Sequence, residues 1–179
     1  FQAYYQVADA LKPSPVIIRT LDLGGDKFLS HLNVPQEMNP FLGWRAIRLT
    51  LQRRDIFETQ LRAICRAGAG HRIRIMFPMI ATLEELTESK IILQNVLLEL
   101  DRESRDRAHD IELGAMIEVP AAVYQARELA ALSDFLSVGS NDLTQYLLAV
   151  DRNNARVADL YQAFHPAVLR ALEQVVQAA

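Results

Sequence analysis

Residues 111–140 read IELGAMIEVPAAVYQARELAALSDFLSVGS and carry the strongest signal for the fold. It opens with an apolar run that ends at Glu118, continues through a helix-like segment after Pro120, and closes with a second apolar run, DFLSVG. Short apolar runs without strict alternation are typical of strands that are buried on both faces of a parallel sheet. The stretch therefore predicts one strand–helix–strand unit with a right-handed crossover.

The same alternation continues towards both ends of the chain and gives about four strands. Strands that alternate with helices indicate an α/β fold with a parallel sheet, and a closed barrel would need eight strands. Before the 111–140 unit we expect a helix over 1–11, a strand in PVIIRTLD (15–22), helices in 41–54 and 56–67, and a strand in RIRIMFP (72–78). A helix from Thr82 towards Glu103, which begins with a capping box, then leads to the unit. After the unit we expect short helices through DLTQYLLAV (142–150) and a last helix from Pro166.

The composition argues against several kinds of partner. The net charge is −3 and no basic run of five residues exists, so no nucleic acid is expected. No apolar run approaches the ~20 residues that span a bilayer, so no membrane insertion is expected. The single cysteine, Cys65, lies in an apolar-spaced segment and is expected to be a buried core residue of a cytoplasmic protein. The four histidines show no metal-ligand spacing, and both chain ends look cut from a longer protein.

Polar residues follow the apolar runs at the strand ends, where parallel α/β folds bind their ligands. Glu118 and Asp142 follow two neighbouring strands, and such carboxylates repel each other unless a cation lies between them. Mg²⁺ takes one or two carboxylates and completes its shell with water and substrate oxygens. The residues alone support a second interpretation equally well, in which Glu118 is an acid at a helix start and Asp142 is a plain N-cap.

Arg19 ends an otherwise apolar strand and needs an anion there. That anion is either a ligand or a structural partner such as Asp22 or Asp26. Asn141 can donate its amide hydrogens to an oxyanion. The loop over residues 23–40, which carries Gly-Gly-Asp-Lys, is unusually long and is expected to be functional.

Five motifs in a fixed order make the pattern specific: VIIRTLDLGGDK (16–27), NPFLGWRAIR (39–48), RIMFPMI (74–80), MIEVPAA (116–122) and DFLSVGSNDLTQYLLAVDR (134–152). They resemble the C-terminal domain of the enzyme I family of phosphoenolpyruvate-protein phosphotransferases. One stretch within them, GSNDLTQY (139–146), is similar to the signature of the wider family, which includes pyruvate phosphate dikinase and phosphoenolpyruvate synthase.

The resemblance implies that residues 1–179 are a single fragment of a (β/α) barrel domain that binds phosphoenolpyruvate at its strand ends. It implies that the phosphohistidine domain, the remaining barrel strands and the proton-donating cysteine lie outside this chain, so that no catalytic residue lies within it. The implied site residues are Glu118 and Asp142 as Mg²⁺ ligands, and Arg19, Arg45, Asn141 and Arg152 as the groups that hold phosphate and carboxylate.

The resemblance also implies a cytoplasmic homodimeric parent. That parent would move the phosphoryl group of phosphoenolpyruvate to a protein histidine, release pyruvate, and serve a phosphocarrier protein in sugar transport. For the fragment we expect binding without turnover, and exposed apolar surface on the inner face of its open sheet. Two other readings remain: a magnesium-dependent carbon–carbon lyase acting on a pyruvoyl compound, which the arginines disfavour, and an inactive fragment.

Overall fold

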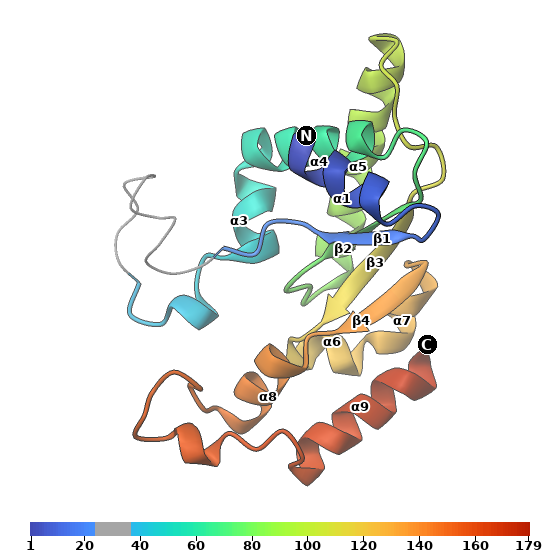
Figure 1. Cartoon of the computed structure of the whole chain (residues 1–179). Helices are drawn as coiled ribbons and strands as arrows, with labels where there is room; N and C mark the ends of the chain where they lie inside the picture. The colour runs from blue at the N-terminus through green and yellow to red at the C-terminus, as the bar shows by residue number, and fades with distance from the viewer. Residues whose placement is uncertain (24–36) are drawn as a thin grey trace.

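The computed structural model describes residues 1–23 and 37–179. Its centre is a sheet of four parallel strands in the order β1-β2-β3-β4, open at both edges (Figure 1). The prediction of an α/β fold with about four parallel strands is confirmed. The strands are β1 (Val16–Arg19), β2 (Ile73–Phe77), β3 (Glu112–Ile117) and β4 (Phe135–Val138).

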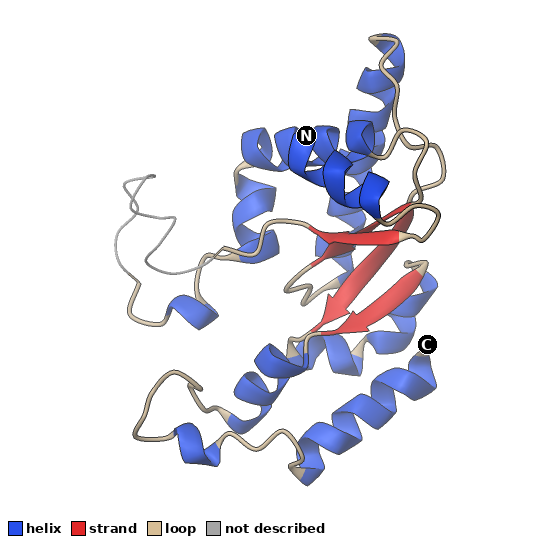
Figure 2. Ribbon diagram, in the orientation of Figure 1, coloured by secondary structure: helices blue, strands red, loops and turns tan. Residues whose placement is uncertain are grey.

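Helices connect consecutive strands and cover the outer side of the sheet, while a long segment after α8 leads to the C-terminal helix (Figure 2). The helices are α1 (Gln2–Ala10), α3 (Ala46–Gln52), α4 (Arg54–Ala67), α5 (Leu83–Arg102), α6 (Pro120–Tyr124), α7 (Ala126–Ala131), α8 (Ser140–Leu148) and α9 (Pro166–Ala178), with 3₁₀ turns η1 (Pro40–Leu42) and η2 (Ala158–Leu160).

The helix-covered face of the sheet forms the core. Alternate strand residues such as Ile75 and Ile117 are fully buried there, and the ring of Phe77 meets Phe57 of α4 edge to face at 6.0 Å. Each such large apolar side chain contributes about 1.5–3 kcal/mol on burial. Cys65 of α4 belongs to this core, as predicted, and burial raises the pKa of its thiol to about 12.

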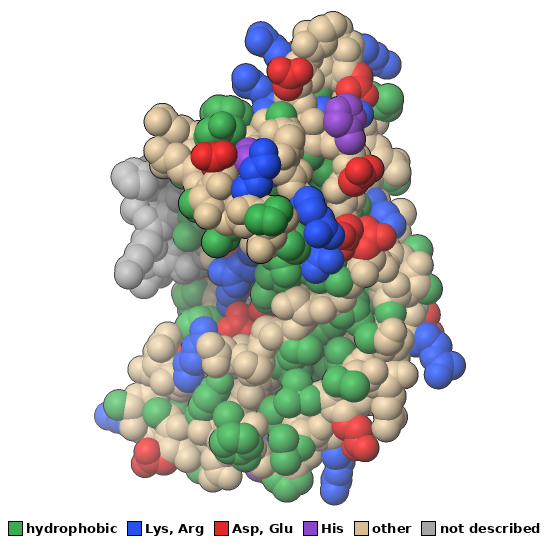
Figure 3. All heavy atoms as spheres, turned by 45° about the vertical axis from the view of Figure 1, so that its right-hand side comes forward, with side chains coloured by type: hydrophobic (Ala, Val, Ile, Leu, Met, Phe, Trp, Pro, Cys, Tyr) green, Lys and Arg blue, Asp and Glu red, His purple; other side chains and the backbone are tan. Residues whose placement is uncertain are grey.

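The opposite face of the sheet carries the other strand residues. Ile17 is 48% exposed there, whereas Met76 and Met116 are 9% and 8% exposed. Arg74 lies over the ring of Phe135 at 5.7 Å. The expected exposure of apolar surface on this face is therefore found at β1 but not along the inner strands. Figure 3 shows hydrophobic side chains gathered over the middle and lower part of the face it views.

Side-chain hydrogen bonds accompany several helix boundaries. Thr82 and Glu85 form the predicted capping box at the start of α5. The helix expected after Pro120 is instead two helices, which meet at Gln125, where the backbone is not helical and the side-chain amide donates to the carbonyl oxygens of Ala81 and Ala121. The imidazole of His165 accepts the Ala167 N–H and caps α9.

Two expectations concern segments rather than single elements. The Gly-Gly-Asp-Lys part of the 23–40 loop, with Asp26, lies outside the described residues. Among residues 1–23 and 37–179, no helix combines the length and apolarity needed to cross a membrane.

Candidate functional site

The segments that leave the four strands meet at the carboxyl end of the sheet, as parallel α/β folds require. Asp22 lies three residues beyond β1, and Met79 two residues beyond β2. Glu118 follows β3 directly, and Asp142 lies in the first turn of α8 after β4. Three carboxylates and one backbone amide are thus brought to one edge.

Asp142 is held between two arginines. Its side chain is 7% exposed; Oδ2 lies 3.1 Å from Nη2 of Arg45 and Oδ1 lies 2.9 Å from Nη1 of Arg152. The ring of Phe41 lies against both guanidinium groups, 5.8 Å from Cζ of Arg45 and 5.9 Å from Cζ of Arg152. Gly139, and not Asp142, is the N-cap of α8, so the alternative reading of Asp142 as a plain N-cap is not what the structure shows.

Asp22 joins two of the arginines named from the sequence. Its Oδ1 accepts a hydrogen bond from Nη2 of Arg45 at 2.9 Å, and its Oδ2 lies 3.0 Å from Nη1 of Arg19. Burial by itself lowers the pKa of Arg45, but the Asp22 hydrogen bond and the charges of Asp22 and Asp142 raise it well above its ordinary value. Arg45 is therefore a permanent cation, and Arg19 has the structural partner that its position required.

Glu118 differs from the other acids because no described cation pairs with it. It is 2% exposed, and its Oε1 accepts the N–H of Met79 at 2.6 Å. Burial raises the pKa of Glu118 to about 7, the Met79 N–H opposes this, and the charges of Asp142 and Asp22 add to it. A Cβ on Gly139 would lie 2.3 Å from Oε2 of Glu118, so the backbone approaches the carboxylate closely on that side.

The donor set fits a hard divalent cation. Glu118 offers a carboxylate that pairs with no cation among the described residues, and Asp142 offers Oδ1, which faces the Arg152 guanidinium at 2.9 Å. Within residues 1–23 and 37–179 no three metal-ligating side chains gather into a cage. Two oxygen-donating carboxylates without a full cage suit Mg²⁺, which is usually held by one or two carboxylates together with water and substrate oxygens.

The arginines named from the sequence are brought together, but Asn141 is not seen to join them. Arg45 and Arg152 share Asp142, and Arg45 and Arg19 share Asp22. The exposed Asn141 instead accepts a hydrogen bond from the hydroxyl of Tyr161 at 3.3 Å.

Sequence reasoning missed several parts of this site. Phe41 and Tyr146 lie within the motifs, but nothing in the sequence assigns them a role, although both contact Arg45 in the structure. The sequence does not indicate that the Met79 amide binds Glu118, or that the Gly139 backbone lies against the Glu118 carboxylate. It shows only that these residues follow β2 and β4. Ala46 and Met79 adopt left-handed backbone conformations, with φ of 49° and 58°, directly beside site residues. Such strain is common at functional sites.

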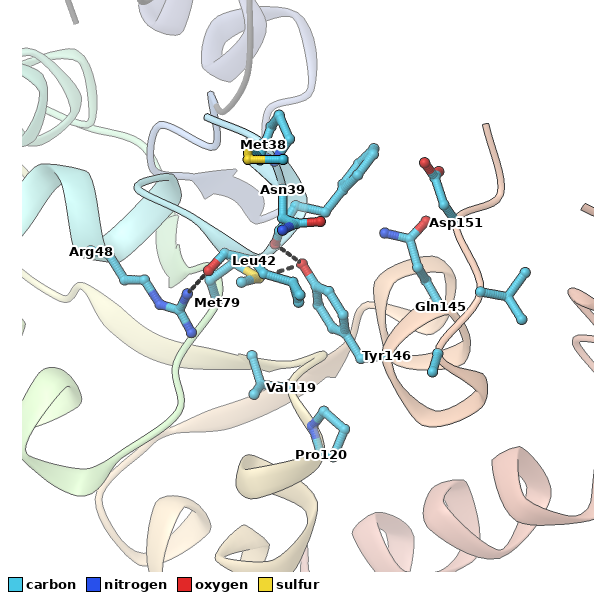
Figure 4. A pocket seen from close by; sticks show the side chains of 14 residues that line it. Met38, Asn39, Leu42, Arg48, Met79, Val119, Pro120, Gln145, Tyr146 and Asp151 are labelled. Carbon is cyan, nitrogen blue, oxygen red and sulfur yellow. Dashed lines mark hydrogen bonds between the residues drawn. The ribbon is translucent and has the colours of Figure 1, made fainter. Parts of the chain in front are cut away.

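A mainly apolar pocket of about 510 Å³ adjoins the site between residues 38–42 and the C-terminal part of α8 (Figure 4). The pocket borders the charged cluster, which consists of Asp22, Arg45, Asp142 and Arg152. Met79 and Tyr146 line the pocket on the side that faces this cluster. The other lining residues are Met38, Asn39, Pro40, Phe41, Leu42, Arg48, Val119, Pro120, Gln145, Ala149, Val150 and Asp151.

The comparisons with known proteins agree with the motifs. Residues 1–179 match the family described as PEP-utilising enzyme, PEP-binding domain. The chain is 51% identical to the phosphoenolpyruvate-protein phosphotransferase of Staphylococcus aureus (strain MSSA476) and 49% identical to those of Haemophilus influenzae and Priestia megaterium, over all 179 residues in each case. It spans 31% of the length of each of these relatives.

A solved citrate lyase from Burkholderia xenovorans LB400 has a similar fold, with a TM-score of 0.57 and 19% identity over 99% of this chain and 46% of that one. This likeness concerns the fold alone. The motifs, the fold and the match over the whole length show that the chain belongs to the family of PEP-utilising enzymes, as a PEP-binding domain.

Proposed function

We propose that this chain binds phosphoenolpyruvate together with Mg²⁺, as the substrate-binding part of a phosphotransferase that passes the phosphoryl group to a protein histidine. The observation that carries the proposal is the pairing of an unmatched buried carboxylate, Glu118, with a cluster of buried and half-buried arginines around Asp142. Phosphoenolpyruvate has a phosphate and a carboxylate that need cations. The arginines would supply part of that positive charge, and Mg²⁺ held by Glu118 would supply the rest.

The arginines would bind and orient the substrate. Nε of Arg45 is buried without a hydrogen-bond partner among the described residues, and Nη1 of Arg152, which lies 2.9 Å from Oδ1 of Asp142, carries a second N–H, so each arginine has a donor available for an anion. Arginine forks match phosphate and carboxylate oxygens in geometry as well as in charge. Arg19, whose side chain is 44% exposed, would approach from the solvent side, and Asn141 would add an amide donor.

The carboxylates would complete the site. Glu118 in its ionised form and Asp142 through Oδ1 would hold Mg²⁺, which would offset charge on the substrate oxygens as the phosphoryl group leaves. Positioned cations supply most of the catalysis in phosphoryl transfer, because the transition state spreads negative charge over several oxygens. The pyruvate product, the phosphocarrier partner and the cytoplasmic location of a dimeric parent remain part of this proposal.

Calorimetric titration of the purified chain tests the proposal. We expect phosphoenolpyruvate to bind at least about tenfold more tightly with Mg²⁺ than with a chelator, and more tightly than pyruvate, which lacks the phosphate. Arg152→Ala and Glu118→Gln should each weaken this binding. Arg62→Ala is the matched control and should not weaken it: Arg62 is a surface arginine, 29% exposed, that pairs with Glu99 and Glu103.

Two results would contradict the proposal. Equal affinity for pyruvate and phosphoenolpyruvate would favour the lyase reading, because a pyruvoyl group would then supply all of the recognition. Loss of binding in Arg62→Ala to the same extent as in Arg152→Ala would show that general charge, rather than this site, attracts the anion.

A further inference from the structure

Tyr146 of α8 lines the apolar pocket (Figure 4), and its hydroxyl also contacts Arg45 of the charged cluster. Its hydroxyl accepts a hydrogen bond from Nη1 of Arg45 at 3.2 Å and donates one to the backbone carbonyl of Phe41 at 2.6 Å. The hydroxyl also lies 3.7 Å from the sulfur of Met79. One neutral oxygen therefore joins α8, the segment that carries Phe41, and the guanidinium of Arg45.

The direction of both hydrogen bonds is fixed by chemistry. A guanidinium has no acceptor, so the Tyr146 oxygen must accept from Arg45, and its proton is then free for the Phe41 carbonyl. Burial raises the pKa of Tyr146, with the positive charge of Arg45 opposing this, and the hydroxyl keeps its proton at neutral pH. The arrangement does not depend on a change of charge.

The two terminal nitrogens of Arg45 make different contacts. Nη2 lies between the two aspartates, Asp22 and Asp142. Nη1 is oriented by Tyr146. A single bridging nitrogen lets a guanidinium swing about that contact, whereas a second contact on the other nitrogen fixes its plane.

Tyr146 also acts on the second arginine by way of Phe41. Its hydrogen bond holds the backbone of Phe41, whose ring contacts both Arg45 and Arg152. We propose that Tyr146 is a positioning residue, whose hydroxyl fixes the plane of Arg45 and the place of Phe41 so that Arg45 and Arg152 face the same anion. This inference rests on the proposed function for the identity of the anion, but not for the contacts.

A double-mutant cycle tests whether Tyr146 acts through Arg45. Tyr146→Phe removes only the hydroxyl and keeps the ring that lines the pocket. We expect it to weaken phosphoenolpyruvate binding in the presence of Mg²⁺ about tenfold in the natural background, and less than about twofold in an Arg45→Lys background. Tyr124→Phe, a change at a side chain that is 78% exposed, is the matched control and should leave the affinity unchanged. An equal loss in both backgrounds would overturn the proposal.

A second measurement needs no substrate. In nitrogen-15 spectra of the arginine side chains, Arg45 in the unaltered chain should rotate slowly about its Cζ–Nε bond compared with the more exposed Arg62. Tyr146→Phe should speed this rotation and shift the Arg45 signal, whereas Tyr124→Phe should do neither. Rotation of Arg45 as fast as that of Arg62 in the unaltered chain would refute the positioning role, even if Tyr146→Phe proved unstable.

The two measurements separate the two proposals. Absence of magnesium-linked phosphoenolpyruvate binding in the unaltered chain would refute the proposed function, while the rotation of Arg45 would still decide the role of Tyr146. Binding with a freely rotating Arg45 would support the function and refute the positioning role.

Discussion

Replacement of Gly139 by alanine should damage the metal-linked site more than the fold. The backbone of Gly139 has φ of −82°, which any residue adopts, so the constraint is space alone. An added Cβ would lie 2.3 Å from Oε2 and 2.7 Å from Cβ of Glu118. The added Cβ would thus overlap both the base and the tip of the Glu118 side chain, while the Met79 N–H holds Oε1. The carboxylate must move by about 1 Å to restore ordinary van der Waals distances.

The expected magnitudes follow from that displacement. Overpacking of this size typically costs about 1–3 kcal/mol, which lowers the melting temperature of a chain this long by roughly 2–12 °C. Mg²⁺ demands near-ideal geometry at about 2.1 Å, so a 1 Å shift of one ligand should weaken magnesium-linked binding of phosphoenolpyruvate by about tenfold or more. Folding is thus predicted to survive where binding does not.

Calorimetric titration with phosphoenolpyruvate and Mg²⁺, together with thermal melting, checks this prediction. Gly70→Ala is the control: Gly70 has φ of 74° with nothing within 4 Å, so alanine there should cost about 1 kcal/mol by strain and leave binding intact. Gly139→Ala with unaltered magnesium-linked affinity would refute the reasoning, because Glu118 would then be free to move without consequence.

Three further predictions concern charge and capping. The pKa of Glu118 is about 7 in the folded chain against an ordinary 4.5, so the folded state keeps a proton that the unfolded state releases. The free energy of unfolding should therefore fall by up to about 3 kcal/mol between pH 4.5 and 7, and Glu118→Gln should flatten this slope in urea titrations at pH 5 and 8. Arg19→Ala should cost less than about 1 kcal/mol, because its side chain is 44% exposed, yet weaken phosphoenolpyruvate binding in calorimetry. Thr82→Ala should lower the stability by about 1 kcal/mol through loss of the capping box, seen in thermal melts, without changing that binding.

Much of the fold was predictable because each parallel strand is an apolar run bounded by helical periodicity. The runs in 15–22, 72–78 and 111–140 all became strands in one sheet. The break between α6 and α7 was not predictable, because it accompanies a hydrogen bond from Gln125 to Ala81, 44 residues earlier. A local pattern carries no information about such a partner.

The site was predictable in part for a similar reason. Topology alone takes acids that follow neighbouring strands, such as Glu118 and Asp142, to the same edge of a sheet. It does not reveal that Tyr146 contacts Arg45 across 101 residues of sequence or that its hydroxyl reaches the carbonyl of Phe41. Those contacts depend on the path of the segment before α3, which neither periodicity nor spacing specifies.

The position of Arg45 has a mechanical consequence for the sheet. Neighbouring strands lie about 4.8 Å apart, so the two edges of a flat four-stranded sheet would be about 14 Å apart. Yet one nitrogen of Arg45 lies 2.9 Å from Asp22, which follows β1, and 3.1 Å from Asp142, which follows β4. The chain segments that leave the two edges must converge at this end, and a single guanidinium holds them there. We expect an anion that draws this nitrogen away from either aspartate to weaken the bridge, which would couple occupancy of the site to the spacing of the two segments.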